Sequence, residues 1–268
     1  MDRAEPVTTE SPGEEREGPR VGSVSAAIAI LRHFAVNPAG AGVNAVARAT
    51  GMSPSSCFNV CKTLTRERFL DFDPDSKLYT LGPGAIVVAR RALDPGGAFV
   101  LVRAKLEKLA EDFQLTAALW RASRNARAIL LGFAESEAAT RIHMSVGQRL
   151  PLLAGAAGRC VAAHSQMGRA ELTARLAEIQ WANPPSIDDY LAEVELARRR
   201  GWALDENGFM RGVTTISAPV LDDHRQVAFS VSSTMFTGQY DAARLEEIGA
   251  ATLGVAQRLG ARVFGHGD

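Results

Sequence analysis

Apolar positions in the first third of the chain recur at the spacing of an α-helix. Residues 23–34 place them on one face, and the pattern ends before Asn37 and Pro38, so we expect a helix there with the apolar positions Val24, Ile28, Ile30, Leu31 and Phe34. A shorter helix is predicted over residues 43–50. Gly51 ends it, because glycine adopts the left-handed C-cap conformation without steric cost.

A second short helix is predicted to begin three residues after Gly51. Ser53 is a suitable N-cap, and Pro54 fits the first helical position, where no N–H group is needed. Two short helices joined by a tight turn that contains glycine form a helix-turn-helix. One side of the second helix is apolar and is predicted to be buried: Cys57, Val60, Cys61 and Leu64.

The opposite side of this helix is polar along its whole length. Small hydroxyls come first, then an amide, then cations; with the N-cap the set is Ser53, Ser55, Ser56, Asn59, Lys62, Thr63 and Arg66. This order suits a helix in the major groove of DNA, where asparagine contacts adenine and lysine or arginine contacts phosphate. An amphipathic surface helix has the same pattern, so the helix alone does not decide the function.

The segment after this helix predicts a hairpin. Two short apolar runs, residues 69–72 and 78–81, flank the turn-forming residues 73–76. A hairpin placed directly after a recognition helix is typical of a winged helix-turn-helix. Lys77 and Tyr79 are predicted to present a cation and a phenol to the DNA backbone.

A break in the chain separates this unit from the remainder. Residues 82–84 end the wing, and residues 86–93 are predicted to form a linker helix that carries Arg90 and Arg91. The run Asp94-Pro95-Gly96-Gly97 then stops that helix, so we place the domain boundary there. The remainder is typical of a single α+β sensor domain. Helices are expected over residues 98–113, 158–165, 169–179, 188–200 and 245–259. Short apolar runs lie at 117–120, 129–133 and 142–144, and strands are expected at 217–221 and 227–232.

Charge is distributed unevenly, although the 268-residue chain is neutral as a whole. Residues 1–19 have a net charge of −4 and a composition that predicts a disordered tail. Residues 20–92 hold nine basic and four acidic side chains, a net charge of +5, while the remainder has a net charge of −1. The positive charge therefore lies in the predicted winged helix together with its linker helix, as expected for a unit that meets phosphate. An ordinary solvated surface can carry the same charge, so charge alone does not decide the function.

Composition excludes several classes of protein. No apolar run approaches the roughly 18–20 residues that span a bilayer, and the acidic N-terminus lacks the features of a secretory signal. Three cysteines form no disulfide framework and fit a reducing compartment. We therefore expect a cytoplasmic protein with no membrane partner and no cofactor.

Several motifs in a fixed order carry a family resemblance. They are residues 51–56 (GMSPSS), 62–64 (KTL), 73–76 (DPDS), 79–82 (YTLG), 146–151 (VGQRLP), 157–163 (AGRCVAA), 201–206 (GWALDE), 212–213 (GV) and 217–220 (SAPV). With the order of helix, helix-turn-helix, wing and linker helix, this chain resembles the IclR-type bacterial transcriptional regulators from about Gly22 to Ala261.

The resemblance implies an α+β protein whose parts follow the acidic tail. They are a winged helix-turn-helix DNA-binding domain over residues 20–82, a linker helix and hinge over 83–97, and a GAF-like effector-binding and oligomerisation domain over 98–268. It further implies a homodimer or homotetramer that binds double-stranded operator DNA and a small-molecule effector. In family members that bind small acids, the matching pocket positions are Ile142, Leu150, Ala156, Ala157, Asp205, Val213, Thr215, Ser230 and Ser232.

The residues themselves fit such a pocket. Gly155-Ala156-Ala157-Gly158 precedes or opens a helix, whose free N–H groups and positive dipole end can hold a carboxylate. Ser230 and Ser232 alternate on a predicted strand, so both hydroxyls face one side. No arginine or lysine occupies these positions, and Asp205 disfavours a second negative charge nearby. We expect a small organic acid or a neutral oxygenated or aromatic metabolite as effector.

Three departures from the family pattern bear on DNA binding. Ala26 and Asn59 stand where such regulators commonly have arginine, and Cys61 replaces a leucine. Losing two cations weakens phosphate anchoring, and asparagine reads adenine where arginine reads guanine. We therefore expect an operator sequence different from those of relatives.

Two pairs of residues also suggest other chemistries, a nucleophilic enzyme and a metal site. Cys160 and His164 are four residues apart, which allows a nucleophilic enzyme, but the cysteine lies in an apolar run without a third orienting group. Cys57 and Cys61 can share a metal only with further ligands, and His33 is the one candidate in the small unit. A regulator is thus expected rather than an enzyme, the alternative being a GAF-like enzyme or sensor with a weakened DNA module.

Overall fold

The computed structural model describes residues 22–123, 125–137 and 142–265. Contacts divide the chain into two compact units, residues 1–89 and 90–268. The division falls inside the segment predicted as linker and hinge. The tail predicted to be disordered, residues 1–19, lies outside the described residues.

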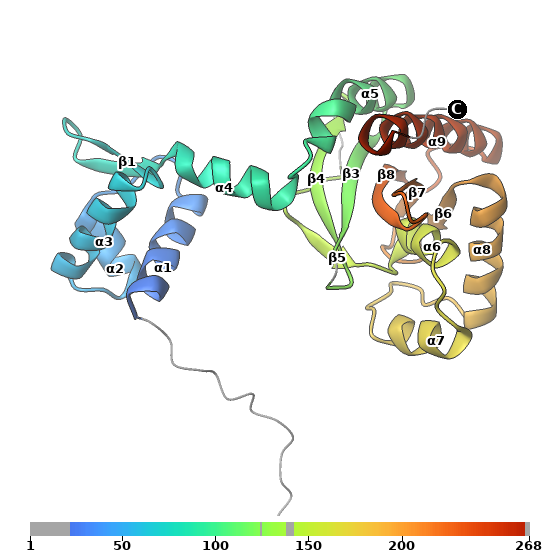
Figure 1. Cartoon of the computed structure of the whole chain (residues 1–268), viewed down its shortest axis with the longest axis horizontal. Helices are drawn as coiled ribbons and strands as arrows, with labels where there is room; N and C mark the ends of the chain where they lie inside the picture. The colour runs from blue at the N-terminus through green and yellow to red at the C-terminus, as the bar shows by residue number, and fades with distance from the viewer. Residues whose placement is uncertain (1–21, 124, 138–141, 266–268) are drawn as a thin grey trace, which may run out of the picture. The chain divides into compact units, whose positions relative to one another are not determined.

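The N-terminal unit is a three-helix bundle followed by a hairpin (Figure 1). Helix α1 spans Gly22–Val36, α2 spans Val43–Thr50 and α3 spans Pro54–Arg66, and the antiparallel strands β1 (Leu70–Asp73) and β2 (Leu78–Leu81) form the wing. The predicted helix-turn-helix and wing are thus present, and their bounds agree with the sequence pattern to within a few residues.

Local capping explains why the turn between α2 and α3 is so short. Gly51 has φ 70°, in the left-handed region, and its N–H donates to the Ala47 carbonyl at the end of α2. Ser53 Oγ accepts from the Ser56 N–H at 3.2 Å, which caps the start of α3. The unit packs around one apolar cluster: Ile30, Phe34, Val46, Ala47, Cys57, Cys61, Leu64, Leu70 and Tyr79.

Helix α4 (Pro83–Leu93) begins three residues before the predicted start of the linker helix. Pro83 stands at its first position, where a missing N–H group has no cost. The flanking Gly82 is required by a close approach, because a Cβ atom there would lie 2.5 Å from the Arg68 carbonyl oxygen.

The C-terminal unit is built on a six-stranded antiparallel sheet in the order β5-β4-β3-β8-β7-β6. Its strands are β3 (Thr116–Ser123), β4 (Arg127–Glu135), β5 (Arg149–Pro151), β6 (Ala203–Glu206), β7 (Val213–Leu221) and β8 (Val227–Phe236). The apolar run at residues 142–144 forms no strand, and β5 and β6 are strands that the sequence pattern did not predict.

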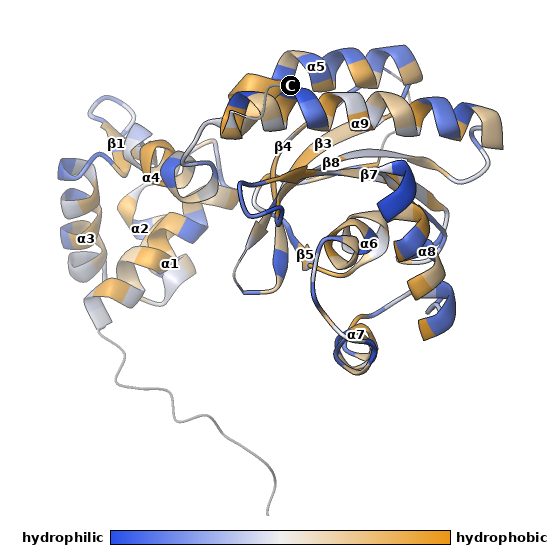
Figure 2. Ribbon diagram, turned by 45° about the vertical axis from the view of Figure 1, so that its right-hand side comes forward, coloured by the Kyte–Doolittle hydropathy of each residue, from blue (hydrophilic) through white to orange (hydrophobic). Residues whose placement is uncertain are grey.

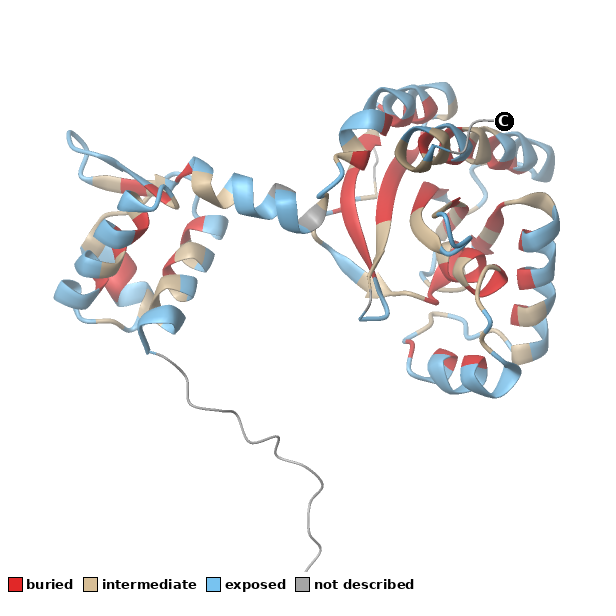
Figure 3. Cartoon of the chain, viewed as in Figure 1, coloured by how far each residue is buried: buried red, intermediate tan, exposed pale blue. Residues whose placement is uncertain are grey.

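Helices cover both faces of this sheet (Figure 2). Helices α5 (Ala98–Phe113) and α9 (Ala242–Phe264) pack on one face and enclose the main apolar core (Figure 3). On the other face, α6 (Gly155–Ala163) and α8 (Ile187–Arg200) pack beside each other, and α7 (Arg169–Ala177) lies against α8. A helix-covered antiparallel sheet is the α+β sensor architecture that the sequence predicted.

Candidate effector pocket and DNA-facing surface

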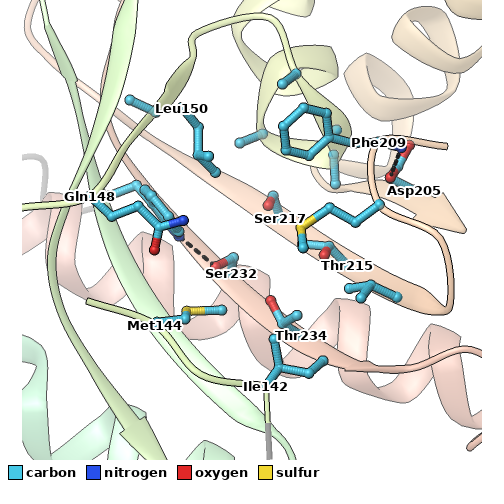
Figure 4. A pocket seen from close by; sticks show the side chains of 18 of the residues that line it. Ile142, Met144, Gln148, Leu150, Asp205, Phe209, Thr215, Ser217, Ser232 and Thr234 are labelled. Atoms are coloured by element: carbon cyan, nitrogen blue, oxygen red, sulfur yellow. Dashed lines mark hydrogen bonds between the residues drawn. The ribbon is translucent and has the colours of Figure 1, made fainter. Parts of the chain in front are cut away.

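A cavity of about 100 Å³ lies between the sheet and the start of α6 (Figure 4). Its floor is made by β3, β7 and β8, and its walls by the segment before β5, the start of α6 and the loop after β6. The lining residues are Trp120, Ala128, Ile142, His143, Met144, Gln148, Leu150, Pro151, Ala154, Gly155, Ala156, Ala157, Asp205, Phe209, Met210, Val213, Thr215, Ser217, Ser232 and Thr234.

Hydroxyl side chains from two paired strands make the floor polar (Figure 4). Thr215 pairs with Thr234 and Ser217 with Ser232 across β7 and β8. The Trp120 Nε1–H donates to Ser232 Oγ at 2.9 Å, which fixes that hydroxyl. The Ser217 side chain is fully buried, and its Oγ has no hydrogen-bond partner among the described residues. A buried hydroxyl without a partner is costly unless a ligand or water satisfies it.

The N-terminus of α6 forms a second polar wall. Its N-cap, Ala154, provides no side-chain hydrogen bond, so the first-turn N–H groups are left for another acceptor. Gly155 has φ 59°, and Gly158 packs so closely that a Cβ atom there would lie 2.0 Å from the Leu153 carbonyl carbon and oxygen. These glycines let the helix start directly against the cavity.

Asp205 is tied into the protein on both carboxylate oxygens. Its Oδ1 accepts from Arg159 Nη1 at 2.9 Å, and both side chains are 4% exposed. Its Oδ2 accepts from the Phe209 N–H at 3.0 Å, which holds the loop after β6. Arg159 Nε also donates to Glu193 of α8. The negative charge that the sequence places at the pocket is therefore paired with a buried cation.

Apolar side chains line the rest of the cavity. Phe209 comes from the loop after β6, where its ring meets the Trp181 ring edge-to-face at 5.9 Å. That loop is held by backbone hydrogen bonds from Ala182 to Phe209 and from Asn183 to Gly208. Met144 and Leu150 project from the segment around β5 (Figure 4). The cavity thus joins a polar floor to apolar walls.

The polar side of α3 is exposed as predicted. Ser55, Ser56, Asn59, Lys62, Thr63 and Arg66 all lie on the surface, and Lys77 is exposed at the wing turn. Ser53 is also exposed, with its hydroxyl used as the helix cap. Beside Asn59, a surface hollow is lined by Ser23, Ala26, Ser53 and Ser56, so the small Ala26 side chain leaves space between α1 and α3.

Tyr79 departs from the prediction for the wing. Its side chain is 4% exposed and packs in the core of the N-terminal unit, with its ring centroid 4.6 Å from that of Phe72. Side chains alternate along a strand, and on β2 the inward position falls on Tyr79. The expectation that its phenol faces the DNA backbone is therefore wrong.

Protein-family models match both units of the chain. The model described as the IclR helix-turn-helix domain matches residues 23–74. The model described as the C-terminal domain of the bacterial transcriptional regulator IclR matches residues 98–261. The chain belongs to the IclR family. It is thus a DNA-binding transcriptional regulator with a C-terminal effector-binding domain.

Curated IclR-family relatives match over most of their length. The HTH-type transcriptional regulator XynR of Escherichia coli is 26% identical over 253 residues, which covers 90% of this chain and 98% of the relative. The acetate operon repressor of Salmonella typhimurium is 21% identical over 249 residues, covering 90% and 89% of the two chains.

Solved structures show the same fold. The IclR transcriptional regulator of Alicyclobacillus acidocaldarius aligns with a TM-score of 0.66 at 26% identity and covers 91% of this chain and 99% of that chain. The IclR of Thermotoga maritima aligns with a TM-score of 0.76 at 19% identity, covering 90% and 98%. Within the described residues, no helix is long and apolar enough to cross a membrane.

Most positions carried over from the family meet at the cavity. Eight of the nine line it, and the exception is Ser230. Ser230 shares the strand face of Ser232, but it lies opposite Trp120 and Pro219, and its buried hydroxyl does not reach the cavity. The predicted role of Ser230 as an effector contact is therefore not supported by its position.

Sequence reasoning missed other lining residues. Ser217 and Thr234 lie two residues beyond predicted pocket positions on their strands, so the alternation of a strand was a usable signal for both. Trp120, Phe209 and Met210 come from segments without a local signal, because only the folded sheet and the loop after β6 bring them to the cavity.

All three cysteines are free and buried. The Cys160 thiol is buried and donates to the Ser217 carbonyl at 3.2 Å, and burial raises its pKa to about 12. Burial lowers the pKa of His164, which follows the last turn of α6. Cys57 and Cys61 lie with their sulfurs 4.0 Å apart, and the described residues form no cluster of three side chains suited to a metal.

Proposed function

We propose that this regulator reads its operator with the exposed face of α3 and that a small oxygenated metabolite in the C-terminal cavity modulates that binding. Asn59 contacts a base edge, with Ser55, Ser56 and Thr63 beside it. Lys62 and Arg66 on α3 and Lys77 on the wing contact phosphates. Tyr79 has no place in this interface because it is buried.

The observation that carries the effector half of the proposal is the unpartnered Ser217 hydroxyl at the floor of the cavity. It lies in the same cavity as the uncapped first turn of α6, and both are hydrogen-bond donors for a ligand oxygen. The apolar walls favour a compact carbon skeleton. A small organic acid or a neutral oxygenated metabolite satisfies both requirements.

We also propose that the protein carries out this function as a homo-oligomer. The described part of α4 exposes three adjacent apolar side chains, Ile86, Val87 and Val88, each more than half exposed. Consecutive residues of a helix point about 100° apart, so apolar side chains are exposed around much of α4, and a second copy of the chain is the partner proposed to cover part of this surface. Two copies present two α3 helices to half-sites about one DNA turn (~34 Å) apart, or a multiple of it, and the α4 segment carries the effector signal.

Operator binding is tested on the DNA fragment upstream of the protein's own gene, with random DNA as competitor and salt varied. We expect selective binding with a steep salt dependence. Binding to both DNAs with equal affinity at every salt concentration would refute sequence-specific recognition. Addition of a panel of small carboxylates and alcohols is expected to change the operator affinity, and no change across the panel would refute the effector half.

Two substitutions on the same helix separate base contacts from phosphate contacts. Asn59→Ala is expected to relax preference at one base pair, by ~1–3 kcal/mol, and to leave binding to random DNA nearly unchanged. Lys62→Ala is expected to weaken binding to both DNAs and to lower the salt slope by about 1. Equal losses on operator and random DNA for Asn59→Ala would contradict its role as a base contact.

A further inference from the structure

We propose that Phe58 of α3 contacts the C5-methyl group of a thymine in the operator and thereby selects that base at one position of each half-site. This inference rests on the proposed function and adds a residue that determines sequence specificity without a hydrogen bond. Phe58 is the fifth residue of α3, and its side chain is 48% exposed although it is large and apolar.

Packing within the N-terminal unit does not account for Phe58. The buried side chains of α3 are Cys57, Cys61 and Leu64. Among the described residues, Phe58 belongs neither to the apolar cluster that they join nor to the side chains packed against it. Helix α3 is described throughout, and Phe58 is the one large apolar side chain that it exposes. A single exposed apolar residue is common on protein surfaces, so its meaning depends on the groups around it.

Phe58 lies within the surface proposed to contact the operator. Consecutive helical residues point about 100° apart, so Phe58 stands between the buried side, marked by Cys57, and the polar side, marked by Asn59. Residues three and four apart are neighbours on a helix surface, so the exposed Ser55 and Lys62 flank Phe58. Phe58 also belongs to the N-terminal half of α3, the part of a recognition helix that reaches base edges. A docking that brings Asn59 to the bases therefore brings Phe58 into the same groove.

The chemistry of the phenyl ring limits what it can recognise in that groove. Covering a polar base edge with an apolar ring removes water from the edge and supplies no hydrogen bond in return, which is unfavourable. The C5-methyl group of thymine is the apolar group that base pairs present in the major groove, and phenylalanine is one of the side chains that contact it. A ring against this methyl group buries apolar surface on both partners.

The spacing along the chain relates this thymine to the base that Asn59 contacts. Cα atoms of adjacent residues are about 3.8 Å apart, close to the ~3.4 Å between successive base pairs. Phe58 therefore reaches the base pair contacted by Asn59 or the pair beside it. Because asparagine suits adenine and the phenyl ring suits thymine, each half-site is expected to present an adenine and a thymine methyl group within this short stretch.

The test removes one methyl group from the DNA and keeps its hydrogen-bonding groups. In the operator fragment that the full chain selects, deoxyuridine replaces the thymines of one half-site, one at a time. The dissociation constant of each duplex is measured by fluorescence anisotropy at constant salt. At one thymine, or at two, we expect deoxyuridine to weaken wild-type binding about fourfold, the effect of losing one buried methyl group.

Substitutions of Phe58 show whether this side chain senses the methyl group. Phe58→Ala is expected to bind the thymine and deoxyuridine duplexes with affinities within about 1.5-fold of each other, and to bind the thymine duplex at least about fourfold more weakly than the wild type does. Alanine favours helix, and Phe58 is half exposed, so this variant is expected to fold. Phe58→Leu keeps an apolar side chain and should retain part of the discrimination. Val36→Ala, which shortens an exposed apolar side chain at the end of α1, is the control and should leave the ratio of the two affinities unchanged.

Phe58→Ala that weakens binding to the thymine and deoxyuridine duplexes equally, and so keeps the wild-type ratio, would overturn the inference. A changed oligomeric state of this variant with the ratio unchanged would place Phe58 in a protein contact and overturn it too. A wild type that selects its operator but tolerates deoxyuridine at every thymine would refute the role of Phe58 and leave the proposed function standing. Failure of the wild type to prefer any operator over random DNA would instead refute the proposed function, and this inference with it.

Discussion

Replacement of Gly158 by alanine tests how the cavity wall is built. A Cβ atom there would lie 2.0 Å from both the carbonyl carbon and the carbonyl oxygen of Leu153. Carbon atoms in contact are ordinarily ~3.5–4.0 Å apart, so the neighbour must move by more than ~1 Å. Both neighbouring atoms belong to the backbone, which cannot rotate away as a side chain can. The chain that leads into α6 must therefore shift.

The cost follows from two opposing effects. Forcing an extra carbon into a packed site typically costs ~1–3 kcal/mol, and more when backbone has to move. Replacing a helical glycine by alanine returns about 0.5–1 kcal/mol through lower chain entropy in the unfolded state. We expect Gly158→Ala to lower the free energy of unfolding by roughly 1–3 kcal/mol. For a unit of this size that corresponds to a melting temperature lower by roughly 3–10 °C.

Tryptophan fluorescence reports on the C-terminal unit, which contains Gly158. All three tryptophans, Trp120, Trp181 and Trp202, belong to the C-terminal unit, so thermal unfolding followed at their emission isolates its transition. Gly254→Ala in α9 is the matched control, because its Cβ would meet only the flexible Arg258 guanidinium at 3.4 Å. The control is expected to be neutral or slightly stabilising. A Gly158→Ala protein that melts at or above the wild-type temperature would refute the steric argument.

Two more predictions follow from local geometry. Ser53→Ala removes the acceptor of the Ser56 N–H and should destabilise the N-terminal unit by ~1 kcal/mol. We expect faster hydrogen exchange of the backbone amides at the start of α3, while the unfolding transition seen by tryptophan fluorescence stays unchanged. Unchanged hydrogen exchange at the start of α3 would contradict the role of Ser53 as the helix cap. Burial raises the pKa of Cys61 and of Cys160 to about 12, so only about one molecule in 10,000 carries either thiolate at pH 8, and a thiol reagent should label neither residue before unfolding. Unfolding returns these thiols toward the ordinary pKa of 9.0, so their contribution to stability is complete below that pH and is lost as the pH rises from 9 toward 12. A denaturation series that shows no loss of stability over that range, or native labelling of either thiol at pH 8, would contradict the assignment.

Local signals were sufficient for the N-terminal unit. Gly51, Ser53 and Pro54 act on their own backbone neighbours, and the structure uses them as expected at the turn and the cap. The apolar stripe of α3 was equally readable, because its period depends on helix geometry alone. Tyr79 was misassigned because a strand of four residues has two faces, and its sequence does not tell which of them meets the bundle.

For the pocket, too, some features follow from short-range sequence patterns and others only from the folded chain. Small residues at the start of α6 and alternating hydroxyls on β7 and β8 are visible in the chain, since helix starts and strand alternation are short-range patterns. The pairing of Arg159 with Asp205 joins residues 46 positions apart, and the Trp120 to Ser232 bond joins residues 112 positions apart. The sequence by itself therefore determined the two units, most of their helices and strands, and the family. Only the tertiary structure decided which polar groups are paired and which, like Ser217, are left for a ligand, because those partners come from distant segments whose meeting no local pattern encodes.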